Sequence, residues 1–125
     1  MTSAQWNQIK FFKPYEFDSP DDPGSGVRMQ FDLMTKLDYL REEVGFPLII
    51  NSGVRTPAHN ADVGGVDGSS HESGYAADIF ARTSLARHAI LAAAFKLGFR
   101  RAGIAKTFIH LDTDPSKPQD VIWLY

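Results

Sequence analysis

The sequence predicts a single α+β domain in which helices pack on a small, mostly antiparallel sheet. The chain of 125 residues has the size of one ordinary domain and is long enough to bury one hydrophobic core. Two segments with helical periodicity lie in its first hundred residues, whereas most of the strand-like segments cluster toward its end. Helices followed by grouped strands are typical of α+β domains. We therefore expect residues 1–125 to form one domain.

Two helices are expected from the spacing of apolar residues. The first runs from about Val27 to Val44, where leucines and valine recur three or four positions apart and form one stripe. Ser25 is suited to cap its start and Gly45 to end it. The second runs from about Ser84 to Leu97, and Thr83 is suited to cap its start.

Short apolar segments bounded by Gly, Pro and polar residues are expected to be strands. A Pro- and Gly-rich acidic stretch at residues 18–26 is expected to be a solvated loop. The expected strands cover residues 46–50, 75–80, 100–105, 108–113 and 121–125.

Composition excludes several classes of partner. The net charge of −2 argues against nucleic acid, because phosphate binding usually requires a strongly basic surface. No polybasic segment and no apolar run of about 18 residues is present, so we expect no membrane partner. The first residues lack the basic and apolar regions of a signal peptide. The chain contains no cysteine, so any metal must be held by His and carboxylate side chains.

Two histidines and an aspartate stand out as a candidate metal site. His71 follows a Gly- and Ser-rich segment, Asp78 lies seven residues later, and His110 lies in an expected strand. Two His and one carboxylate form a three-ligand zinc set that leaves a fourth position for water. That composition is typical of a catalytic zinc site rather than a structural one.

The expected strands support this grouping. Alternation along residues 108–113 places His110 and Asp112 on one face, while the apolar Ile and Leu between them point to the other. Asp78 lies among Ala and Ile residues, where a carboxylate is costly to bury unless it is paired or bound to a metal.

Each candidate ligand also has a plain structural alternative. His71 is compatible with a surface residue of a loop, Asp78 with a turn or cap residue, and His110 with a hydrogen-bonded core histidine. Glu72 directly after His71 suggests a zincin helix, but that motif needs a second histidine where this chain has Tyr75.

These residues resemble a known family. The sequence is similar to the zinc D-alanyl-D-alanine carboxypeptidases and phage endolysins of peptidase family M15, which share a fold with the hedgehog signalling domain. The resemblance is to its short, single-domain branch and covers about residues 11–113. The matching blocks are the signature Ser-x-His-x-x-Gly-x-Ala-x-Asp at Ser69–Asp78, Ser-Gly-x-Arg at Ser52–Arg55, His59-Asn60, His-x-Asp at His110–Asp112, and the opening Phe12–Phe17.

The resemblance implies one zinc ion, held by His71, Asp78 and His110. It also implies that Arg55 lies over the cleft and binds a substrate carbonyl or carboxylate, for which its fixed fork of donors is suited. Asn60 and Ser69 match positions that line the substrate site in relatives.

The chain departs from the family pattern at the general base. Many relatives carry an acid three residues before the last zinc ligand, and some carry a histidine two before it, but this chain has Thr107 and Phe108 there. Neither side chain can accept a proton from water. Asp112 is the nearest substitute, so we expect Asp112 and Arg55 to be the catalytic residues. The alternative is that Asp112 bonds to a ligand histidine and fixes its tautomer.

The resulting expectation is a monomeric zinc peptidase that cuts peptide bonds in peptidoglycan stem peptides or cross-links. A short chain without an export signal suits a phage or prophage endolysin, which stays in the host cytoplasm until its release to the wall, or a virion-associated enzyme. One alternative is a wall-binding or virion module that has lost catalysis, and another is a phage tail-assembly peptidase. The bond that is cut stays open among D-Ala-D-Ala, L-Ala-D-Glu and the cross-link to a diamino acid.

Overall fold

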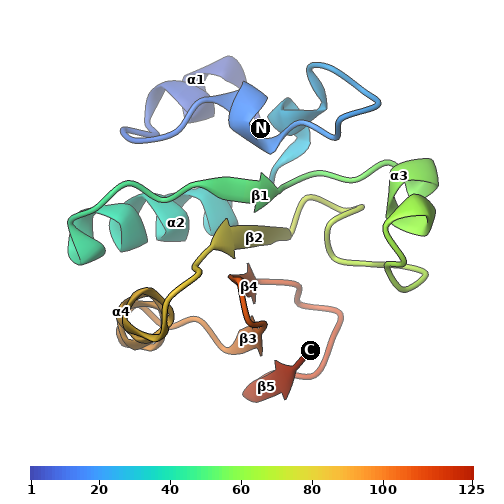
Figure 1. The fold of residues 1–125 in the computed structure, drawn as a ribbon. Coiled ribbons are helices and arrows are strands. Elements are labelled where there is room, and N and C mark those ends of the chain that lie inside the picture. Colours follow the sequence, from blue (N-terminus) through green and yellow to red (C-terminus); the bar gives the residue numbers. More distant parts are fainter.

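A computed structural model describes residues 1–125. Helices and strands follow one another along the chain as shown in Figure 1. In chain order they are α1 (Ser3–Asn7), the 3₁₀ helices η1 (Pro14–Phe17) and η2 (Ser25–Arg28), α2 (Phe31–Val44), β1 (Ile50–Ser52), α3 (Pro57–Asp62), β2 (Ala76–Phe80), α4 (Ser84–Lys96), β3 (Arg101–Ile104), β4 (Phe108–Asp112) and β5 (Val121–Leu124).

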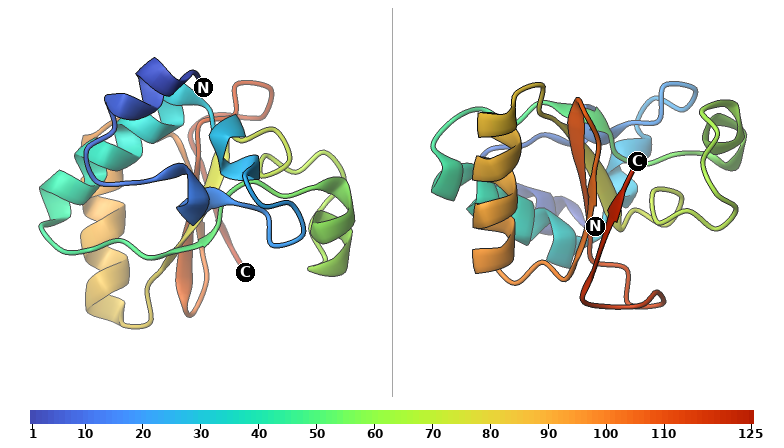
Figure 2. Two further views of the ribbon diagram at one scale, coloured as in Figure 1. Left: turned by 90° about the horizontal axis from the view of Figure 1, so that it is seen from above. Right: turned by 60° about the horizontal axis from the view of Figure 1, so that its bottom comes forward.

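The five strands form one sheet in the order β1-β2-β4-β3-β5. Neighbouring strands are antiparallel except β3 and β5, which are parallel. Figure 2 shows α2 and α4 on one side of the sheet and α3 on the other. The predicted α+β class, with helices on a mostly antiparallel sheet, is confirmed. No helix has the length and apolar character needed to cross a bilayer.

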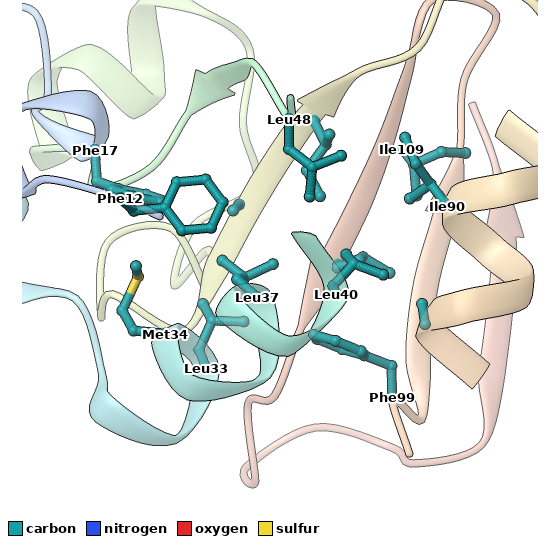
Figure 3. Packing of buried hydrophobic residues seen from close by; sticks show 14 of the residues in the cluster. Phe12, Phe17, Leu33, Met34, Leu37, Leu40, Leu48, Ile90, Phe99 and Ile109 are labelled. Carbon is teal, nitrogen blue, oxygen red and sulfur yellow. The ribbon is translucent and has the colours of Figure 1, made fainter. Parts of the chain in front are cut away.

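The hydrophobic core lies between the sheet and the helices α2 and α4 (Figure 3). Because side chains alternate along a strand, each central strand divides its residues between this core and the opposite face. Ile79, Ile109 and Leu111 are fully buried in the core. Their neighbours Asp78 and His110 are cross-strand partners of β2 and β4 on the opposite face.

The start of α2 differs from the expectation. The helix begins at Phe31 rather than near Val27, and Ser25 lies in η2 instead of capping α2. The backbone of Gln30 is extended, and its N–H donates to the carbonyl of Gly74 at 3.0 Å. This contact between distant segments separates the 3₁₀ turn from the helix. The spacing of apolar residues cannot predict such a tertiary contact.

The other predicted ends are close to the observed ones. α2 ends before Gly45, and the side-chain oxygen of Thr83 accepts from the N–H of Ala86 at the start of α4. The last four expected strands match β2–β5 within one residue at each end. The strand expected at residues 46–50 lies further along the chain, because β1 covers Ile50–Ser52 and the hydrogen bonding to β2 begins with the carbonyl of Ile49, which accepts from Phe80 N–H at 2.9 Å. Pro47 has no N–H to donate to a ladder.

The short helices were missed by periodicity, which needs several turns to become visible. α3 nevertheless carries a local signal, since Thr56 caps it by accepting from the N–H of His59, and Pro57 occupies its first turn. A capping box between Thr2 and Gln5 marks the start of α1 in the same way.

Candidate metal centre and its cleft

The structure brings the three expected ligands together. Asp78 on β2 lies directly opposite His110 on β4, and His71 lies in the loop that leads into β2. Asp78 Oδ1 is 3.3 Å from His71 Nε2 and 3.0 Å from His110 Nδ1. One ligand atom from each residue lies within 4.8 Å of the others, and all three residues are buried.

Backbone contacts set the orientation of the His71 ring. Its Nδ1 lies 2.8 Å from the carbonyl oxygen of Gly53. A carbonyl oxygen only accepts, so this contact requires the proton of the neutral ring to be on Nδ1. The lone pair of Nε2 then points toward Asp78.

The His110 ring is oriented by a carboxylate. Its Nε2 lies 2.7 Å from Asp112 Oδ2, and its Nδ1 faces Asp78. The pKa of Asp112 lies below its usual value: burial acts to raise it, but hydrogen bonds with His110 and Arg101 outweigh that effect. An ionised carboxylate only accepts, so the contact with Asp112 keeps a proton on Nε2 and leaves Nδ1, which faces Asp78, as the atom that would bind a metal in place of a proton.

One nitrogen of each histidine and a carboxylate oxygen of Asp78 therefore converge on one small volume. Adjacent ligands of a tetrahedral zinc ion lie roughly 3.3 Å apart, given zinc–nitrogen bonds of about 2.0–2.1 Å. The two distances from Asp78 Oδ1 match that value. Each histidine also donates from its far nitrogen to an oxygen acceptor, which is the arrangement that orients metal-binding histidines. The donor set fits a zinc ion.

The charges of the cluster support the same conclusion. Burial acts to raise the pKa of Asp78, but hydrogen bonds with His110 and His71 outweigh it and lower that pKa far below its usual value. Burial lowers the pKa of His71 below its usual value. Burial also acts to lower the pKa of His110, but hydrogen bonds with Asp112 and Asp78 outweigh it and raise that pKa. The carboxylate is thus ionised near neutral pH, and a cation is what the cluster favours.

Arg55 binds the carboxylate oxygen of Asp78 that the two histidines do not face. Its NH2 nitrogen donates to Asp78 Oδ2 at 3.1 Å, which leaves Asp78 Oδ1 for the metal position. Its Nε and NH1 nitrogens donate to Ser52 Oγ at 3.0 Å and to Asn60 Oδ1 at 3.3 Å. A guanidinium has five N–H groups, so two stay free to bind substrate. Arg55 lines the cleft.

The two residues expected to line the substrate site lie in different places. Ser69 lines the cleft, and its Oγ accepts from the N–H of His71 at 3.2 Å. Asn60 is buried behind the cleft wall, where it holds Arg55 and donates to the carbonyl of Val66 at 2.8 Å. Its backbone carbonyl also accepts from the N–H of Gly65 at 2.8 Å, so Asn60 supports the cleft wall from behind.

The contacts of Asp112 match the alternative role considered for it, in which it bonds to a ligand histidine and fixes the tautomer. Besides the bond of Oδ2 to His110, its Oδ1 accepts from Arg101 Nε at 2.6 Å and from the N–H of Asp114 at 3.2 Å. Both oxygens are therefore occupied by donors of the protein itself. This geometry favours orientation of His110 over direct proton transfer, and a catalytic role for Asp112 stays a prediction.

The cleft above the cluster has a volume of about 580 Å³. The resemblance pointed to Arg55 and Ser69 in its wall but not to the residues that follow position 113 or to β3. The Gly-rich loop at residues 63–66 forms another part of the wall. The wall residues that the sequence analysis missed are Arg101, Lys117, Trp123 and Tyr125.

Glu72, which follows His71, is turned away from the cleft. Its Oε2 accepts from the N–H of Ser69 at 3.1 Å, and it is not part of the cleft wall. Phe108 lines the cleft but has no ionisable group. Every carboxylate beside the cluster therefore already has a partner within the protein.

A buried His-Asp-His cluster in a cleft on one face of a mostly antiparallel sheet is the type of site that metal-dependent hydrolases use. The chain belongs to the peptidase M15 family, whose pattern it matches over residues 14–112. It is therefore a metallopeptidase by family. No curated protein is similar enough to the chain to count as a match.

Proposed function

We propose that the chain is a zinc peptidase that hydrolyses peptide bonds in the stem peptides or cross-links of bacterial peptidoglycan. The observation that carries the metal assignment is the convergence of His71 Nε2, Asp78 Oδ1 and His110 Nδ1, with the other ring nitrogen of each histidine in contact with an oxygen acceptor. Three protein ligands leave a position for water and substrate.

Zinc in such a site would supply Lewis acidity, which lowers the pKa of bound water to about 7 and polarises a carbonyl. The protein's own residues hold and orient the reactants. Arg55 keeps Asp78 in place through Oδ2, and its two free N–H groups are suited to a substrate carbonyl or carboxylate. Asp112 keeps the proton of His110 on Nε2.

The choice of peptidoglycan rests on the resemblance and on the charge of the cleft. Arg55, Arg101 and Lys117 line it together with two aspartates. Asp78 and Asp112 are paired with these arginines, and Lys117 lies 4.0 Å from Asp114 Oδ2, so the free donors of Arg55 give the cleft its cationic character toward substrate. Peptidoglycan stem peptides carry carboxylates, which such groups bind.

We further propose a phage or prophage origin, with the enzyme held in the host cytoplasm before release to the wall or carried by the virion. The size of the domain and the similarity of its motifs to short endolysins support this proposal.

Purified peptidoglycan with the zinc-loaded protein provides the test, with release of new amino termini as the signal. We expect wild type to release them, chelator to abolish release, added zinc to restore it, and Asp78→Asn to be inactive. Mass spectrometry of the fragments then identifies the bond. Zinc-loaded, folded protein that releases nothing from walls or from defined wall peptides would refute the proposal.

A second candidate is a zinc-containing wall-binding module without catalysis. The occupied oxygens of Asp112 and the absence of an ionisable group at Thr107 and Phe108 favour it. Such a module would sediment with purified walls and release no amino termini, so the same preparation separates the two candidates.

A further inference from the structure

We propose that strand β5 completes the metal centre, and that Trp123 is a positioning residue that holds the ring of His110. The proposal rests on the proposed metal site and adds to it a segment that lies outside the family match, which ends at residue 112.

The register of the sheet places Trp123 in line with the metal ligands. Asp78 on β2 is opposite His110 on β4, His110 is opposite Gly103 on β3, and Gly103 is opposite Trp123 on β5. Residues opposite one another in a sheet point to the same face. This cross-strand row therefore runs from the metal cluster to the edge of the sheet.

The absence of a side chain at Gly103 allows the indole of Trp123 to reach His110. A Cβ atom at Gly103 would overlap Trp123 Nε1, and it would lie 2.7 Å from Trp123 Cε2 and 2.8 Å from Tyr125 Cε2. The indole therefore occupies the space that a side chain at position 103 would fill. It reaches the ring of His110, with 5.2 Å between centroids and an interplanar angle of 56°.

A second route connects Trp123 to the same histidine. The guanidinium carbon of Arg101 lies 5.0 Å from the centre of the Trp123 ring, a cation–π contact. Arg101 donates to Asp112, and Asp112 accepts from His110 Nε2. The NH1 nitrogen of Arg101 also donates to the carbonyl of Pro118, in the segment that leads into β5.

These contacts give Trp123 two effects on one ligand. The indole packs against the His110 ring and limits its rotation about the side-chain bonds. It also covers Arg101, which keeps water away from the buried contact of Arg101 with Asp112. Both effects keep His110 Nδ1 directed at the metal position, and orienting partners of this kind typically change metal affinity about 10–100-fold.

Zinc affinity, measured by competition with a chromogenic chelator, tests the proposal. We expect Trp123→Leu, which keeps an apolar side chain on the strand, to bind zinc about tenfold more weakly than wild type. Trp123→Phe should recover most of the affinity because it restores a ring. Gly103→Ala should reproduce the loss with Trp123 still present, since the added methyl group displaces the indole.

Leu124→Ala is the matched control, because Leu124 lies on the same edge strand, is 78% exposed and contacts no ligand. Its zinc affinity should equal that of wild type. Cobalt substitution provides a readout that strand stability alone does not move. The visible absorption bands of the cobalt form should shift in Trp123→Leu and Gly103→Ala and stay unchanged in Leu124→Ala.

The outcomes separate this inference from the metal site itself. Wild-type protein that binds no zinc would contradict the proposed function. Wild type that binds zinc, with equal affinity and an equal cobalt spectrum in Trp123→Leu and Gly103→Ala, would overturn the role of Trp123 alone. If Trp123→Leu does not fold, Gly103→Ala decides by the same criteria.

Discussion

Replacing Asp112 by asparagine tests how His110 is prepared for metal binding. Arg101 Nε and the N–H of Asp114 both donate to Oδ1 of Asp112, and neither can accept. The asparagine carbonyl must therefore occupy the Oδ1 position, which puts its NH₂ group against His110 Nε2. That nitrogen must then accept, so the ring proton moves to Nδ1, the atom that faces Asp78.

This change of tautomer blocks the ligand lone pair. Loss of a carboxylate that orients a ligand histidine costs about 10–100-fold in metal affinity. We expect Asp112→Asn to lose zinc affinity within that range and to regain activity when excess zinc is added. Chelator competition measures the affinity, and hydrolysis of a wall peptide over a zinc series measures the recovery.

Asp114→Asn is the matched control. Asp114 is also buried and its carboxylate accepts from Ser70 and Ser116, but it contacts neither histidine of the cluster. Its removal should leave zinc affinity unchanged. The reasoning is refuted if Asp112→Asn retains full zinc affinity. Full affinity with at least ~100-fold lower turnover would instead show that Asp112 is the general base.

Three further predictions concern substrate, pH and stability. Arg55→Ala should keep about one zinc per chain but lose roughly 10–100-fold in kcat/KM, the loss expected for a charge-assisted hydrogen bond to substrate, as steady-state kinetics would measure. Zinc affinity should fall as the pH drops through and below neutrality, because the raised pKa of His110 lets a proton compete with the metal, whereas the lowered pKa of Asp78 keeps its carboxylate ionised. Calorimetry in buffers of different ionisation enthalpy should accordingly detect a proton released when zinc binds. If no proton is released below the pKa of His110, the predicted competition between proton and metal is wrong. Protein with chelator should have a lower Tm than protein with zinc at a hundredfold excess over Kd, because zinc binding at that concentration adds about 2.7 kcal/mol to the free energy of unfolding. An unchanged Tm would mean that the metal does not bind the native state.

The metal ligands could be predicted from the sequence because local rules place them. His71 and Asp78 lie in one short signature, and alternation along a strand puts His110 on the face opposite the apolar Ile109 and Leu111. The structure adds which nitrogen of each histidine faces the cluster. That depends on the carbonyl of Gly53 and on the carboxylate of Asp112, contacts that the sequence alone does not specify.

The outer part of the site could not be predicted in this way. Trp123 reaches His110 only because β5 pairs in parallel with β3, and the register of that pairing depends on the whole sheet. Gly103 and Arg101 likewise give no local signal of their contacts. The resemblance reaches only to about residue 113, so the last strand was predicted as a strand and nothing more.

Anomalous diffraction at the zinc absorption edge, from crystals grown with zinc, tests the central claim most directly. We expect one anomalous peak per chain, within about 2.0–2.2 Å of His71 Nε2, Asp78 Oδ1 and His110 Nδ1. His110 Nε2 should still contact Asp112. A peak at any other position, coordination through His110 Nε2, or no peak despite bound zinc in solution would contradict the assignment of the metal centre.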